Sequence, residues 1–110
     1  MKRKTIDRRR DGRLEMSSPA LVSLPGRTPI TDAPAVMVDL STTGMRLHMW
    51  ISMPKHRMAS VRIDIDGEVY AVNGRVVRVE PAPEGGHLIG LEFDPASLEN
   101  NPFPDCVLGT

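Results

Sequence analysis

Two short segments of this 110-residue chain combine residue types that could bind an anion. The first is Arg8-Arg9-Arg10-Asp11-Gly12-Arg13. Guanidinium groups are permanently charged and fork-shaped, so they bind phosphate oxygens bidentately and can also pair with O6 and N7 of guanine. Gly12 allows the chain to bend, so that Arg9 and Arg13 can converge on one ligand. Taken alone, the composition of this segment favours a solubilising tail.

The second segment is Asp39-Leu40-Ser41-Thr42-Thr43-Gly44. Asp39 and Ser41 project to the same side of an extended chain. A carboxylate can accept hydrogen bonds from N1–H and N2–H of guanine, and a serine hydroxyl can donate to a phosphate or carbonyl oxygen. Gly44 permits a backbone conformation that other residues avoid. Taken alone, this segment is an ordinary Asx or Ser turn.

The charge of the chain is unevenly distributed. Residues 1–13 hold seven basic and two acidic side chains, a net charge of +5, and the remaining 97 residues carry −5. A basic arm on an acidic body indicates an anionic partner that is met at one end. A nucleic acid is not the expected partner, because such binders are basic over a whole face or domain.

Enzyme chemistry has no positive signal in the sequence. No phosphate-binding loop, nucleophile elbow or Ser/His/Asp set stands out. Asp64 and Asp66 could pair as acid and base, but Asp66-Gly67 is more simply the turn of a hairpin. Metal-ligand spacing is absent among Cys106 and the three histidines, which are His48, His56 and His87. We therefore expect a protein that is not an enzyme and that needs no metal or cofactor.

The elements that must position these segments are predominantly strands. Runs that alternate apolar and polar residues, or that are rich in β-branched residues, are bounded by Gly, Pro and Asp turn signals. The expected strands are Ala20–Leu24, Ala35–Leu40, Met45–Trp50, 61–66, Glu68–Val79 and His87–Phe93. Their spacing predicts an all-β fold, an antiparallel sandwich or small barrel.

The segments between and after these strands carry their own expectations. Residues 27–34 contain two prolines and are expected to form a loop, and Asn73-Gly74 suggests a bulge or sharp bend. One helical turn is expected at 95–100, after an Asp94 cap. The tail beyond it contains Pro102 and Pro104 and is expected to be irregular.

The domain organisation follows from these elements. We expect a flexible arm at 1–15, a single barrel domain at 16–100 and an irregular tail at 101–110. A single cysteine suits a reducing compartment, and no apolar run approaches the roughly 18 residues of a membrane span. The expectation is a cytoplasmic protein without membrane insertion.

Four features in this order resemble the PilZ domain family. They are R-x-x-x-R at Arg9–Arg13, D-x-S-x-x-G at Asp39–Gly44, and the strand segments Gly74–Val79 and Ile89–Phe93. The resemblance extends from about Arg8 to Asp94. It implies a six-stranded antiparallel β-barrel with short helical elements, which binds the bacterial second messenger cyclic di-GMP without chemistry.

The resemblance also assigns roles to individual residues. Arg9 and Arg13 would hold phosphate and the Hoogsteen edge of guanine, Asp39 and Ser41 would contact guanine or a neighbouring phosphate, and Gly44 would shape the turn. Arg78 stands near the position where some members of the family stack an aromatic ring on the ligand. Its guanidinium plane can also stack on a purine.

The function that the resemblance implies is that of a ligand-controlled adaptor. Binding would order the arm against the barrel of a monomer and present a new surface to an effector protein. Two alternatives stay open: a PilZ-like interaction domain that acts without ligand, and a small barrel that binds single-stranded RNA. The second is disfavoured because the aromatic residues are too few and too scattered to form a stacking platform.

The residue directly before R-x-x-x-R leads to a prediction about stoichiometry. In similar domains an arginine there tends to accompany capture of an intercalated cyclic di-GMP dimer, and here it is Arg8, with Arg10 as a further cation. Extra fixed cations offset the repulsion between the phosphates of two ligands. We expect two ligands per chain, and Arg8→Leu should shift the ratio towards one while binding is retained. A calorimetric ratio of one for the unmodified protein would show that Arg8 points into solvent.

Overall fold

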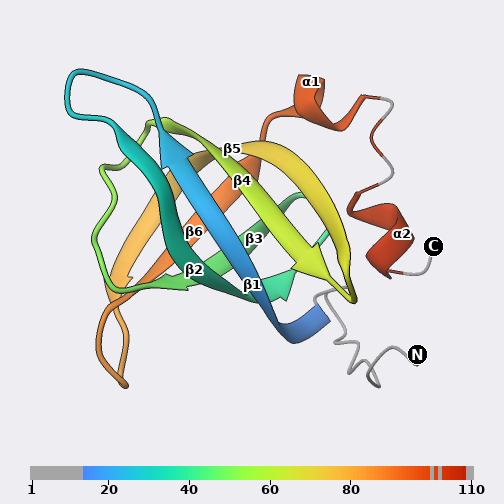
Figure 1. Ribbon diagram of the computed structural model, residues 1–110, viewed down its shortest axis with the longest axis horizontal. Coiled ribbons are helices and arrows are strands. Elements are labelled where there is room, and N and C mark those ends of the chain that lie inside the picture. Colours follow the sequence, from blue (N-terminus) through green and yellow to red (C-terminus); the bar gives the residue numbers. More distant parts are fainter. Residues whose placement is uncertain (1–13, 100, 102, 109–110) are drawn as a thin grey trace.

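The computed structural model, which describes residues 14–99, 101 and 103–108, is a closed six-stranded antiparallel β-barrel (Figure 1). The strands follow one another around the barrel in the order β1-β2-β3-β6-β5-β4. Their bounds are β1 Leu14–Leu24, β2 Ile30–Leu40, β3 Gly44–Met49, β4 Met58–Ile65, β5 Glu68–Pro81 and β6 His87–Phe93. The fold class expected from the sequence is therefore confirmed.

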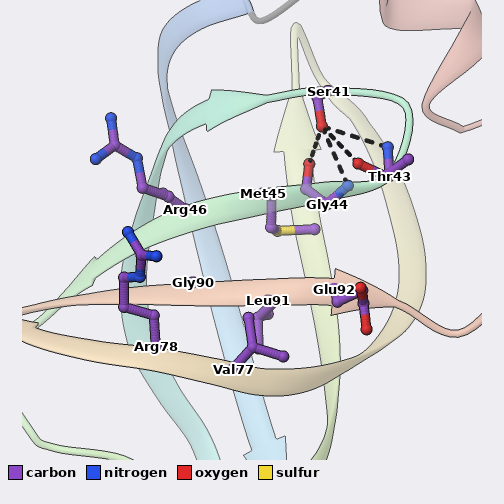
Figure 2. Close-up of a pocket in the computed structure, with 10 residues that line it drawn as sticks. All are labelled: Ser41, Thr43, Gly44, Met45, Arg46, Val77, Arg78, Gly90, Leu91 and Glu92. Atoms are coloured by element: carbon purple, nitrogen blue, oxygen red, sulfur yellow. Dashed lines mark hydrogen bonds between the residues drawn. The ribbon is translucent and has the colours of Figure 1, made fainter.

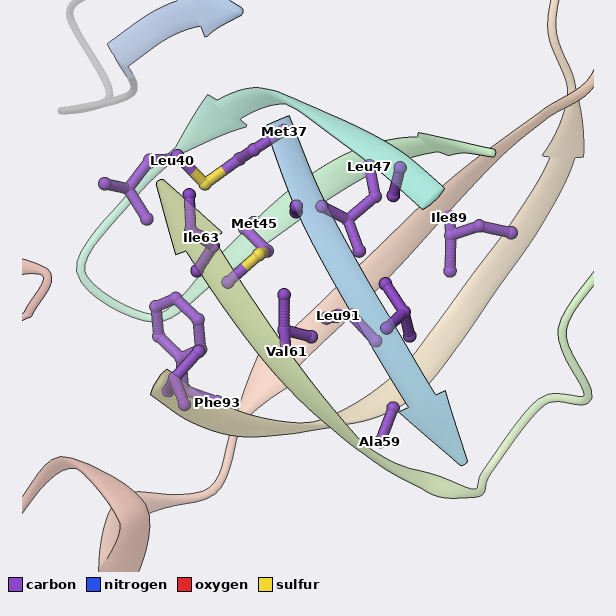
Figure 3. Packing of buried hydrophobic residues seen from close by; sticks show 14 of the residues in the cluster. Met37, Leu40, Met45, Leu47, Ala59, Val61, Ile63, Ile89, Leu91 and Phe93 are labelled. Carbon is purple, nitrogen blue, oxygen red and sulfur yellow. The ribbon is translucent and has the colours of Figure 1, made fainter. Parts of the chain in front are cut away.

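Alternating side chains fill the barrel from all six strands (Figure 3). In β4 every second residue is buried, so that Val61, Ile63 and Ile65 point inward while the polar residues between them face solvent. Met37 and Leu47 are fully buried on neighbouring strands. Burial of these aliphatic and methionine side chains is the main favourable contribution to folding, at roughly 1.5–3 kcal/mol for each fully buried large side chain.

The strand pairing contains four register shifts. Two lie between β1 and β2, at Glu15/Ser18 and at Val22/Leu24. The other two lie between Met37 and Asp39 in β2 and between Val76 and Arg78 in β5, and there the alternation of inward and outward residues changes phase. The bend expected at Asn73-Gly74 is wrong, because both residues pair with β4 in unbroken register. The tight approach of Gly74 to β6 accounts for that glycine instead: a Cβ there would lie 3.2 Å from Cβ of Leu91.

The turns agree with the sequence in one place and differ in another. Asp66-Gly67 connects β4 to β5 with both residues at positive φ, 55° and 88°, as expected for a two-residue hairpin. The loop expected at 27–34 is shorter, because β2 already begins at Ile30. Pro34 pairs with Leu21 of β1, whereas pairing of β2 with β3 starts at Ala35. At Pro34, β2 is therefore paired with a neighbouring strand on one side only, and the missing N–H of a proline is tolerated there.

Two four-residue helices follow the barrel, α1 (Pro95–Leu98) and α2 (Asp105–Leu108), and both lie at the same side of it (Figure 1). Asp94 caps α1 by accepting a hydrogen bond from the backbone N–H of Ala96, as the sequence predicted. Neither of these helices, the only ones among the described residues, is long and apolar enough to cross a membrane.

The irregular tail expected at 101–110 is wrong for its central part. Besides forming α2, this segment buries Phe103, Val107 and Leu108 in the core. The ring of Phe103 packs against Tyr70 and Phe93, with centroid distances of 5.4 and 6.0 Å. Pro102 and Pro104 prevent a long helix in this segment, but its apolar side chains can be buried against the barrel without one.

Replacement of the tail aromatic should therefore destabilise the whole barrel. Phe103→Ala removes a fully buried ring, and the cavity should lower the free energy of unfolding by about 3–5 kcal/mol. Urea denaturation followed by circular dichroism measures the change. Val69→Ala, at a strand position that is 65% exposed, is the control and should shift the midpoint little. Equal stability of the two variants would mean that the tail is not part of the core.

Candidate functional site

A row of five residues crosses five strands on the outside of the barrel. Glu15 of β1 lies opposite Asp39 of β2, Asp39 opposite Arg46 of β3, Arg46 opposite Gly90 of β6, and Gly90 opposite Arg78 of β5. Directly opposed residues project to the same face of a sheet. The row therefore places carboxylates at one end and two arginines, separated by a glycine, at the other.

The register shifts in β2 and β5 are what bring Asp39 and Arg78 into this row. From Ala33 to Met37 the inward residues of β2 are odd-numbered, so unbroken alternation would point Asp39 into the core. One extra residue before Asp39 turns it to the outer face and returns Leu40 to the interior. The same change in β5 turns Arg78 outward after the inward Val76.

An open groove of about 490 Å³ lies over this part of the barrel wall (Figure 2). Its floor is low at Gly90, which has no side chain, and Arg46 and Arg78 stand on either side of Gly90. Glu92 lies farther along β6, on the side of the Ser41–Gly44 turn. The groove is lined by Ser41, Thr43, Gly44, Met45, Arg46, Val77, Arg78, Gly90, Leu91 and Glu92. It thus offers cations at one end and a carboxylate at the other.

Arg46 is held at the groove by an ion pair with Asp39. The Nε–H of Arg46 donates to Oδ2 of Asp39 at 2.6 Å. The two partners differ in exposure: the side chain of Asp39 is 1% exposed, and that of Arg46 is 44% exposed. A carboxylate removed from water in this way needs a charged or hydrogen-bonded partner. The pair therefore anchors one side of the guanidinium and leaves its terminal nitrogens towards solvent.

Ser41 stabilises the turn between β2 and β3. Its Oγ accepts from the backbone N–H groups of Thr43, at 3.3 Å, and Gly44, at 3.2 Å (Figure 2). The backbone N–H of Ser41 donates to the carbonyl oxygen of Gly44 at 2.9 Å. These bonds satisfy backbone groups that a tight turn leaves unpaired, so the Ser turn that the sequence suggested is present.

A glycine is needed at position 44 for a different physical reason from the one expected from the sequence. Its φ does not lie in the left-handed region, so conformational freedom does not explain the glycine. A Cβ at this position would instead lie 2.2 Å from the backbone carbonyl oxygen of Leu91, a severe overlap. Gly44 is therefore required by the close approach of β3 to β6, which forms one wall of the groove.

The structure brings several of the predicted site residues together. Ser41, Gly44 and Arg78 line the groove, and Asp39 lies behind it, paired with Arg46. The four arginines of the arm lie outside the described residues; these are Arg8, Arg9, Arg10 and Arg13.

Arg46 and Gly90 were missed by the sequence reasoning. The alternation of Met45-Arg46-Leu47 does turn Arg46 outward, directly after the motif turn. However, nothing in the sequence pairs it with Asp39 or places Gly90 between two arginines, because those neighbours come from strands far apart in the chain.

The other residues considered for chemistry have local roles. Asp64 accepts a hydrogen bond from the backbone N–H of Gly67 in the hairpin, at 3.0 Å. Nε2 of His48 lies 2.7 Å from the carbonyl oxygen of Gly85. Within residues 14–99, 101 and 103–108, no group of three or more His, Cys, Asp or Glu side chains is arranged to hold a metal ion.

Comparison with known proteins identifies the class to which this barrel and groove belong. The PilZ domain profile matches residues 7–101, so the chain belongs to the PilZ domain family. Such domains generally serve as non-catalytic receptors, which supports a receptor or adaptor kind of function.

A solved structure shows the same fold. It is the Bacillus subtilis inhibitor of motility (MotI/DgrA), with a TM-score of 0.61 and 16% sequence identity over 88% of this chain. The match covers 51% of that protein, so the present chain spans about half of its length. A comparison with curated protein sequences finds no match.

The contact between Gly44 and Leu91 leads to a prediction about stability. Gly44→Ala should force β3 and β6 apart and lower the free energy of unfolding by roughly 1–3 kcal/mol or more, the usual range for overpacking. Gly74→Ala is the matched control, because its Cβ would meet its nearest atom at 3.2 Å rather than 2.2 Å, and it should cost less. Thermal unfolding of both variants measures the difference. A Gly44→Ala protein as stable as the unmodified one would show that the strands adjust freely.

Proposed function

We propose that this protein is a non-enzymatic receptor for cyclic di-GMP, and that the groove beside the Ser41 turn is the barrel's part of the binding site. The observation that carries the proposal is a groove that has two outward guanidiniums, Arg46 and Arg78, at one end and the D-x-S-x-x-G turn of a PilZ domain at the other. A doubly charged dinucleotide requires fixed cations, and a groove with a low floor admits a flat base.

The arm supplies the second part of the site. The first residue of β1, Leu14, pairs with Leu40, which directly precedes Ser41. The chain therefore enters the barrel beside the motif turn, and Arg13 is the residue immediately before this entry point. The R-x-x-x-R motif is thus tethered within reach of the groove. Arg9 and Arg13 bind phosphate and guanine from the side opposite the barrel wall.

Signalling follows from closure of the arm over the ligand. Residues 1–13 carry a net charge of +5, and a bound dinucleotide, two per chain when Arg8 and Arg10 take part, neutralises much of it. A segment with this composition folds onto its site only when the ligand offsets the ordering entropy. The ordered arm and ligand then form a surface that an effector protein can distinguish from the free barrel.

A titration with cyclic di-GMP tests the receptor function. We expect a dissociation constant on the order of micromolar or tighter, which corresponds to a binding free energy of about −8 kcal/mol. GTP and RNA oligomers should bind far more weakly. Arg9→Ala and Arg13→Ala should each weaken binding by roughly 1.5–3 kcal/mol, with little change in melting temperature because the arm precedes the strands. Isothermal titration calorimetry measures the dissociation constants, and thermal unfolding measures the melting temperatures.

Two results would contradict this function in different ways. No heat and no NMR shifts at about a hundredfold excess over a micromolar constant would exclude the ligand and favour a PilZ domain that acts through constitutive protein contacts. Normal binding by both arginine variants would leave the groove as the site and make the arm a solubilising tail.

A further inference from the structure

We propose that one end of the barrel docks on the surface of a lipid bilayer that carries anionic headgroups. This end, here called the loop end, is formed by the loops 25–29, 50–57 and 82–86. The contact is peripheral: the side chains of Trp50 and Ile51 lie at the level of the headgroups, and basic side chains lie against the phosphates. The inference goes beyond the proposed function and does not depend on cyclic di-GMP.

The three loops meet at one end because neighbouring strands of the barrel are antiparallel. They connect β1 to β2, β3 to β4 and β5 to β6 (Figure 1). The β2–β3 turn with Ser41 and the β4–β5 hairpin lie at the opposite end, as does the first residue of β1, where the arm enters. A bilayer at the loop end therefore leaves the motif turn and the entry point of the arm accessible.

Trp50 is held in place and is nevertheless exposed. Its indole packs on the backbone of Gly85 and Gly86, where an added Cβ would lie 3.1 and 3.0 Å from atoms of the ring. It also makes an edge-on contact with His48, at a centroid distance of 5.0 Å. Even so, Trp50 is 69% exposed, and the next residue, Ile51, is 45% exposed. Most of this apolar surface is therefore presented to solvent in a defined orientation.

The loop end has a net charge opposite in sign to that of the rest of the barrel. The three loops carry three permanent cations, Arg27, Lys55 and Arg57, all exposed, and one carboxylate, Glu84. The other residues from 14 onward carry four basic and eleven acidic side chains. An anionic surface attracts the cations and repels the acidic remainder. The charge distribution therefore orients the loop end of the barrel towards such a surface.

The loop 50–57 is attached both to the loop 25–29 and to the core. A terminal nitrogen of Arg57 donates a hydrogen bond to the carbonyl oxygen of Pro25. Met53, in the middle of the loop, is 3% exposed and packs in the core. The apolar and cationic groups of the loop end are thus presented together on anchored segments, which lowers the entropic cost of docking.

A bilayer fits these groups better than an acidic protein does. A stable protein interface buries about 800 Å² per partner and is centred on a cluster of apolar anchors. The three loops expose two large apolar side chains, Trp50 and Ile51. In the headgroup region a single indole is favourable because its ring is amphipathic. Basic side chains beside it can bind the lipid phosphates.

Fluorescence tests this proposal directly, because Trp50 is the only tryptophan of the chain. The nucleotide-free, unmodified protein is titrated with vesicles of equal parts phosphatidylglycerol and phosphatidylcholine. Its emission should shift to the blue and be quenched by lipids with brominated acyl chains, and the protein should co-sediment with the vesicles. Binding to vesicles of phosphatidylcholine alone should be about tenfold weaker or more, because they carry no net charge.

Variants at the loop end should weaken binding to the anionic vesicles. Arg27→Ala combined with Lys55→Ala should lower the partition coefficient about twentyfold, which is roughly fivefold for each cation. Trp50→Ala should lower it about tenfold in the sedimentation assay, and Ile51→Ser replaces it if that variant does not fold. Val69→Ala is the control, because this 65% exposed side chain lies beside the hairpin at the opposite end, and it should leave binding within about twofold.

The basic arm is a second cationic part of the chain, so a charge-matched variant separates the two. Lys2→Ala combined with Lys4→Ala removes two cations from the arm and should leave the blue shift of Trp50 at saturation in place. Co-sedimentation without a change in Trp50 emission would show that the arm binds the vesicles and would overturn the proposal. Absence of binding to the anionic vesicles would also overturn it, and would leave the exposed Trp50 to a protein partner. The titration with cyclic di-GMP is independent of all these outcomes, so the proposed function is tested separately.

Discussion

The strict alternation of side chains along a β-strand is the constraint on which the rest of this structure depends. A closed barrel has a buried inner face and a solvent-exposed outer face, and successive residues of each strand point to these two faces alternately. In β2 and β5 unbroken alternation would direct Asp39 and Arg78 into an aliphatic core, where an unpaired charge is strongly unfavourable. One extra residue in each strand changes the phase, and the charged residues meet on the outer face instead.

The groove exists because two strands approach closely where side chains are absent. Gly44 lets β3 come so near to β6 that a methyl group would overlap the carbonyl oxygen of Leu91, and Gly90 leaves the wall bare between two arginines. In both cases the glycine matters for space rather than for backbone conformation. Around this hollow, Ser41 stabilises the turn and Asp39 holds Arg46, so the polar groups at the groove have defined positions.

Stability and the candidate site depend on different parts of the chain. The core is aliphatic, and the aromatic cluster that extends it includes Phe103 from beyond the last strand, packed on Tyr70 and Phe93. The arm that carries R-x-x-x-R enters at Leu14, beside the motif turn. Under the proposed function, changes in the arm act on ligand binding while the barrel stays folded, whereas changes in the tail act on folding itself.

The sequence by itself determined the strands with clear alternation, the Asp66-Gly67 hairpin, the Asp94 cap and the two motifs, since these signals are local and have a fixed period. Only the tertiary structure decided that residues 30–34 join β2, that Phe103 is buried, and that Asp39, Arg46, Gly90 and Arg78 share one row. A β-bulge leaves little signal in the local sequence, as the bend wrongly expected at Asn73-Gly74 shows. The position of a bulge is set by pairing with strands distant in the chain, because that pairing decides which face of the sheet each side chain occupies.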